Sequence, residues 1–170
     1  SLRGPARLAA SRLATDAASA QGLAVQSDDL TMGGRGAAME MTGPARITAT
    51  ALSASDLRLG QVTGRAMLDA RMDGALLIQA DGALHAARAA WPLFGPVGAD
   101  DPEDLKAMKQ ALGDFGLSVP AVRLTTGSPG TTVALDRPVE LRPRNGGVLR
   151  IAAADARPVF AAEPGQAGGG

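Results

Sequence analysis

The chain lacks cysteine altogether and is poor in aromatic residues. Without cysteine among its 170 residues it has no disulfide, no thiolate ligand for a metal ion and no cysteine nucleophile. Hydrophobic residues make up 45% of the chain, but only 2% of it is aromatic, with no tyrosine, one tryptophan and three phenylalanines. The apolar surface must therefore consist almost entirely of Ala, Leu, Val, Ile and Met side chains.

An excess of charge and a long apolar run are also missing. Lys plus Arg and Asp plus Glu each number 17, so no broad positive field attracts a phosphate backbone, and nucleic acid is not expected as a partner. No run approaches the roughly 18 apolar residues of a membrane-spanning helix. Residues 1–5 lack the pattern of a signal peptide, and the first residue is Ser1. We therefore expect an excerpt of a longer protein, with any membrane anchor outside it.

Alternation of apolar and polar residues dominates the first ninety positions. From Arg65 to Met72 every second residue is apolar, and Asp73-Gly74 then has the composition of a two-residue turn. The alternation resumes from Leu76, and Asp81-Gly82 repeats the turn signal. Residues 65–90 are therefore predicted to be a meander of short strands, and residues 1–90 a longer repetitive β-meander.

An internal repeat supports stacked β units. The segment Gly4-Pro5-Ala6-Arg7-Leu8 returns as Gly43-Pro44-Ala45-Arg46-Ile47, and Leu13 matches Leu52 at the same offset. Repeats of this length are typical of units that stack on one another. The predicted fold class is therefore mainly β, a repetitive antiparallel meander that forms a twisted, curved, groove-like sheet.

The alternation breaks at residues 91–96, and a loop followed by an amphipathic helix is predicted over 91–117. Asp101 is expected to cap this helix, which begins with Pro102 and runs over about 101–114. Its apolar residues recur at three- and four-residue steps, so this stripe is expected to pack on the sheet. The predicted packing face consists of Leu105, Met108, Leu112 and Phe115.

Strand patterns resume over 118–162 and are predicted to continue the sheet. One turn between these strands is predicted at Asn145-Gly146-Gly147. Residues 163–170 have the composition of a flexible, Gly-rich tail. The whole chain is expected to be one domain or part of a larger one.

No residue set typical of an enzyme is present. The only histidine, His85, falls on the polar side of a predicted strand, and a Gly-x-Ser-x-Gly elbow is missing. Gly33-Gly34-Arg35-Gly36 lacks the Gly-Lys-Ser/Thr ending of a phosphate-binding loop and predicts a β-turn. The acids within 100–104 suit helix capping rather than a calcium ion. We therefore expect no catalytic residue, metal or cofactor, and predict that the chain is not an enzyme.

The aliphatic side of the predicted strands is the remaining candidate for function. If uncovered, it suits acyl chains, which require apolar area and little geometry. The core of a closed β-sandwich shows the same alternation, so a non-enzymatic structural or protein-interaction module of the cell envelope is the alternative. The candidates for a lipid-facing groove are Leu8, Met39, Met41, Ile47, Leu57, Leu59, Leu68, Met72, Leu76, Ile78 and Leu84.

Several segments resemble the YdbH family of AsmA-like, or bridge-like, envelope proteins. The resemblance is densest from about Ala90 to Ile151 and rests on turns and strand starts: Trp91-Pro92-Leu93-Phe94-Gly95-Pro96, residues 119–124, 135–139 and 145–149. It implies a periplasmic protein, anchored in the inner membrane through a region outside this chain, that moves phospholipids between inner and outer membranes along an aliphatic groove. It also implies phospholipid acyl chains and a small outer-membrane lipoprotein as partners, and no catalytic residues.

Overall fold

The structure is a computed structural model that describes residues 1–14, 18–127, 130–152 and 160–162. Its first half is an uninterrupted antiparallel meander of five long strands. They are β1 (Leu2–Ala14), β2 (Ala18–Arg35), β3 (Ala38–Ala54), β4 (Leu57–Asp73) and β5 (Ala75–Ala90). The helix α1 (Glu103–Gly113) follows. After it come β6 (Phe115–Thr126), β7 (Thr131–Leu135), β8 (Val139–Pro143), β9 (Leu149–Ile151) and β10 (Phe160–Ala162).

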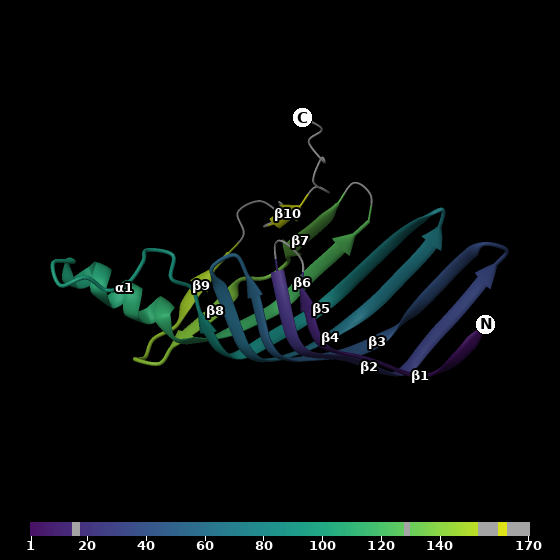
Figure 1. The fold of residues 1–170 in the computed structure, drawn as a ribbon, viewed down its shortest axis with the longest axis horizontal. Coiled ribbons are helices and arrows are strands. Elements are labelled where there is room, and N and C mark those ends of the chain that lie inside the picture. Colours follow the sequence, from purple (N-terminus) through teal and green to yellow (C-terminus); the bar gives the residue numbers. More distant parts are fainter. Residues whose placement is uncertain (15–17, 128–129, 153–159, 163–170) are drawn as a thin grey trace, which may run out of the picture.

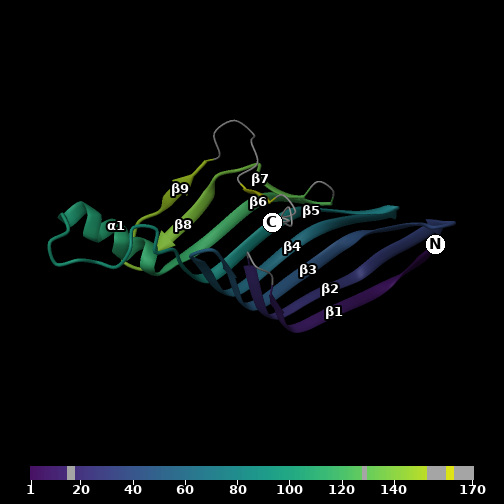
Figure 2. The same cartoon turned by 45° about the horizontal axis from the view of Figure 1, so that its top comes forward.

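All ten strands belong to one open sheet. Its order is β1-β2-β3-β4-β5-β6-β7-β10, and β8 pairs with β6 beside β9. The strands run side by side and curve together, so the sheet is a trough, and α1 projects from one end of it (Figures 1 and 2). Among the described residues, no strand pairs with the outer edge of β1. The predicted mainly β, antiparallel and curved meander with one inserted helix is confirmed.

The strands of the meander are longer than predicted, because one expected turn does not form. Asp73-Gly74 does end β4, and Gly74 adopts a φ of 71° there. Asp81 and Gly82, in contrast, lie inside β5 and pair with Met67 and Ala66. A Cβ on Gly82 would lie 2.6 Å from the Cα of Ala66, so glycine is required here for close strand approach and not for a turn.

Two further turn predictions have mixed outcomes. Of the glycine-rich segment 33–36, only Gly36 belongs to the turn, whereas Gly33, Gly34 and Arg35 extend β2. The segment 145–147 lies between β8 and β9 as predicted. The predicted tail, 163–170, and residues 153–159 of the predicted C-terminal strands lie outside the described residues.

Partway along the strands of the meander, the alternation of apolar and polar side chains shifts by one position. We call this shift the face switch. On β4 the side chains of both Val62 and Leu59 pack in the core, although three positions separate them. Gln61 lies between them with a φ of 52°, in the left-handed region. A residue with this backbone conformation displaces the pleat by one position, as in a β-bulge, and bends the strand. The same side of the sheet therefore stays apolar on both sides of the shift. The strands curve along their length (Figure 1).

Replacing Gln61 with glycine is expected to raise the free energy of unfolding by about 0.5–1 kcal/mol, because glycine adopts the left-handed conformation without the steric cost of a side chain. The matched control is Gln79→Gly in β5, which has no positive φ and should lose about 0.5–1 kcal/mol. Urea denaturation of the two variants measures both values. Equal destabilisation by both would contradict a strained Gln61.

The buried core lies at the helix end of the trough. Ala49, Val62 and Ala86 occupy adjacent strands, and Phe115 on β6 and Leu141 on β8 belong to the same cluster. Small alanines in the meander leave room for the larger side chains beside them, so the sheet gains a core on one face without a second sheet. This core fixes the geometry at one end of the trough.

The helix is placed differently from the prediction. It extends beyond the sheet instead of lying across it (Figure 1). Leu112 is buried in the core, but Leu105 is only half-buried and Met108 is 48% exposed. Phe115 is buried as the first residue of β6, because the helix ends at Gly113. The predicted packing face is therefore wrong for Met108 and holds fully only for the last turn.

Asp101 does not cap the helix, whose N-cap residue is Pro102. The Asp101 carboxylate instead accepts hydrogen bonds from Lys109 Nζ at 2.8 Å and from the Gly98 N–H at 2.7 Å. Lys109 first, and then Gly98, lower the pKa of Asp101 below its usual value. Lys109 also donates to the Pro96 carbonyl at 3.0 Å, so this group ties the preceding loop to the helix.

Candidate functional site

Cross-strand pairing places the apolar side chains of the meander in rows. Leu8 pairs with Val25, Val25 with Ile47, and Leu84 continues this row through Gly64. Directly opposed residues of an antiparallel sheet project from the same face. The same pairing joins two further groups of predicted groove residues, Met41 with Ile78 through Ala70, and Met39 with Met72 and Leu76.

The predicted groove residues therefore lie on one face. Leu68 alternates with these rows on β4, and Leu57 and Leu59 reach the same face beyond the face switch. We call this surface the aliphatic face.

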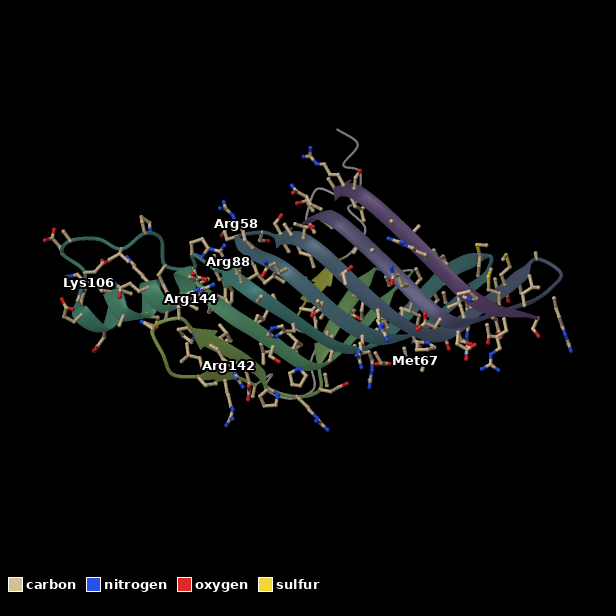
Figure 3. All side chains as sticks on the ribbon, turned by 90° about the horizontal axis from the view of Figure 1, so that it is seen from below. Arg58, Met67, Arg88, Lys106, Arg142 and Arg144 are labelled. Atoms are coloured by element: carbon tan, nitrogen blue, oxygen red, sulfur yellow. The ribbon has the colours of Figure 1, made fainter. Side chains whose placement is uncertain are left out.

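The opposite face is polar and charged. Arg3 forms an ion pair with Asp29, Arg71 with Asp69 at 3.1 Å and Arg123 with Asp81 at 2.8 Å. Seen from below, the convex underside of the trough carries Arg58, Arg88 and Arg142 (Figure 3). Met67 also lies there, as its place in the alternation predicted. The aliphatic face is consequently the concave one.

The aliphatic face is uncovered over much of its area. Leu8 is 67% exposed and Leu76 is 53% exposed, although both are large apolar side chains. In the described part of the chain every strand belongs to the single sheet, and α1 contacts only the end of it. A second sheet, which a closed sandwich would require, is not found among these residues.

Exposure changes along the trough. At the helix end Val62 and Ala86 are almost fully buried in the core. Toward the turn between β4 and β5, Met39, Met72 and Leu76 are exposed. Methionine is unbranched and polarizable, so these side chains adapt to an apolar ligand of variable shape. The open end of the trough is thus its most adaptable part.

A hollow of about 270 Å³ lies beyond the face switch, and its lining is nearly all apolar. Leu57 and Leu59 line it, as predicted candidates, and residues absent from the prediction join them: Leu13, Ala18, Ala20, Leu52 and Ala54. Strict alternation from Ile47 along β3 would place Leu52 on the polar face. The face switch lies between these two residues, so Leu52 is on the aliphatic face instead. The repeat, which places Leu13 and Leu52 at equivalent positions, was the one signal in the sequence that joined them.

No cluster of metal-ligating side chains occurs in the described residues. His85 is exposed on the polar face, as predicted, between Thr63 and Ser118 in the register. Within residues 1–14, 18–127, 130–152 and 160–162, no three His, Asp or Glu side chains gather as metal ligands. The one helix of this part of the chain is too short to span a membrane. On the concave side, what the described surface offers a ligand is mainly apolar area.

Comparison of the chain with protein-family models, curated proteins and solved structures finds no match. The aliphatic face is therefore the feature of the chain from which a function can be inferred.

Proposed function

We propose that this chain is a segment of a lipid-conducting protein and that phospholipid acyl chains lie along the aliphatic face. The observation that carries the proposal is a broad, concave apolar surface that no second layer covers among the described residues. Burial of each methylene of an acyl chain gains roughly 0.8 kcal/mol. An acyl chain gains this energy at many positions along a smooth aliphatic surface. It can therefore slide along the surface without any covalent bond being made or broken.

The polar, ion-paired convex face supports the same proposal. Its charged side chains keep the convex side in contact with water, whereas the concave side has an apolar surface that suits the lipid tail. The wider setting follows the family resemblance: a periplasmic, non-enzymatic bridge, anchored in the inner membrane outside this segment, that passes phospholipids toward the outer membrane and meets a lipoprotein there. The hollow beyond the face switch would receive one end of an acyl chain.

Two adjacent leucines test the proposal, because they project from opposite faces. Leu76 is on the aliphatic face, and Leu77, 38% exposed, pairs with Arg71 on the polar face. Leu76→Arg places a charge in the lipid path and should lower the phospholipid that co-purifies with the chain several-fold. Leu77→Arg adds the same charge outside the path and should leave the lipid content unchanged. Quantitative lipid mass spectrometry of both purified variants measures the difference.

Equal lipid content in the two variants and the unmodified chain would contradict the proposal. It would favour the second candidate, a structural or protein-interaction module of the envelope. The open edge of β1 supports that candidate, because its unpaired backbone groups can accept a strand from another protein. In that case the aliphatic face is covered by protein, and lipid is absent from all three samples.

A further inference from the structure

Arg46 and Arg65 form a pair of like charges on the polar face. They are directly opposed on β3 and β4, an arrangement that disfavours the folded sheet unless an anion joins them. Some other arginines of this face have acidic partners: Glu140, for example, accepts from both Arg142 and Arg150. Among the described residues, no ion pair or hydrogen bond engages the side chain of Arg46 or Arg65.

A shallow depression of about 470 Å³ lies beside this pair. Hydrogen-bonding side chains of a neighbouring register row line it, and no carboxylate does. This row runs across four strands, from β3 to β6, and each member is paired with the next. Its members are Thr48, Thr63, His85 and Ser118.

The nearest acidic groups are engaged elsewhere or belong to a different depression. Asp28 and Asp81 line an adjoining hollow, which Arg46 and Arg65 also line, and Asp81 is held by Arg123 at 2.8 Å. Glu140 is opposed to Ser118, but two arginines hold it, and they lower its pKa. Among the side chains that line the depression itself, Arg46 and Arg65 are cationic and none is acidic.

We propose that this depression binds a phosphate monoester of a small polyol or sugar. Two guanidinium groups present paired N–H donors that fit phosphate oxygens, and the hydroxyls of Thr48, Thr63 and Ser118 supply further donors. A volume of about 470 Å³ exceeds that of a phosphate ion and leaves room for the esterified group. The site lies on the face opposite the trough, so it does not depend on the proposed function.

Isothermal titration of the chain with inorganic phosphate and with glycerol phosphate tests the site. Glycerol phosphate should bind saturably and more tightly than inorganic phosphate. Arg46→Gln and Arg65→Gln should each weaken binding about tenfold, through loss of charge-assisted hydrogen bonds. The matched control is Arg88→Gln, which removes an arginine from the same face outside this depression and should leave binding unchanged.

A second arm uses vesicles of phosphatidylcholine with and without phosphatidic acid, to separate a lipid headgroup from a free phosphate monoester. Flotation that requires phosphatidic acid, Arg46 and Arg65 identifies the headgroup as the source. Binding of glycerol phosphate alone identifies a soluble ligand. Absence of saturable binding to every probe, or equal weakening by Arg88→Gln, would overturn the proposal.

Discussion

Phe115→Ala is expected to lower the free energy of unfolding by about 3–5 kcal/mol. Phe115 is 1% exposed and belongs to the core at the helix end of the trough. It begins β6 directly after α1, so its ring joins the core at the point where the helix meets the sheet. Removal of the ring leaves a cavity that the paired strands around it cannot close.

The matched control is Phe94→Ala, which removes the same ring from a position that is 47% exposed. This variant should change the free energy of unfolding by about 1 kcal/mol or less. Chemical denaturation followed by circular dichroism compares the two variants. Similar losses would show that the core is not located around Phe115.

Gly82→Val should destabilise the sheet by about 3 kcal/mol, because β4 approaches β5 too closely for a side chain there. A Cβ at this position meets the backbone of Ala66, which cannot rotate away as a flexible side chain can. Displacement of that backbone breaks the register on both sides of the pair. Thermal and urea denaturation measure the loss.

Gly33→Val is the control for this substitution. Gly33 also lies within a strand, β2, but no atom lies within 4 Å of a Cβ placed there. Because valine favours strands, this variant should be neutral or more stable by about 0.5–1 kcal/mol. If Gly82→Val were equally neutral, the inference that β4 and β5 approach too closely at Ala66 for a side chain on residue 82 would be wrong.

The fold class was predictable because alternation in this chain reports directly on sheet faces. From Arg65 to Met72 every second residue is apolar, with Met67 the exception on the polar side, and β4 follows this alternation as predicted. The turn at Asp73-Gly74 forms where its sequence favours a positive φ. Local signals of this kind act through neighbouring residues alone, so sequence is sufficient for them.

The extent of the strands was not predictable from local signals. Asp81-Gly82 has the composition of a turn, but the structure uses its glycine for contact with Ala66 on the next strand. Asp101 likewise fits a helix cap, yet it binds Lys109 and the Gly98 N–H instead. In both cases a contact made in the folded chain decides the outcome, with Ala66 on the neighbouring strand for Gly82 and with Lys109 on the helix for Asp101.

The sequence predicted residues that share the aliphatic face along most of the trough, but it missed most of those that line the hollow beyond the face switch. All eleven predicted groove residues lie on the aliphatic face, because cross-strand pairing preserves their alternation. Leu52 on β3 and its neighbours around the hollow were missed, because the alternation shifts by one residue at the face switch. This shift is marked on the neighbouring strand β4 by the left-handed conformation of Gln61. Glutamine carries no strong signal for that conformation, so the face switch becomes visible only in the folded sheet.

Photo-crosslinking from two adjacent positions of β5 tests the central claim, that acyl chains occupy the aliphatic face. A photoreactive amino acid replaces either Ile78, which lies on that face, or Gln79, which lies on the polar face. In cells that contain the full-length protein, we predict phospholipid adducts from position 78 and none from position 79. Adducts from position 78 only to protein, or equal lipid capture from both positions, would contradict the account.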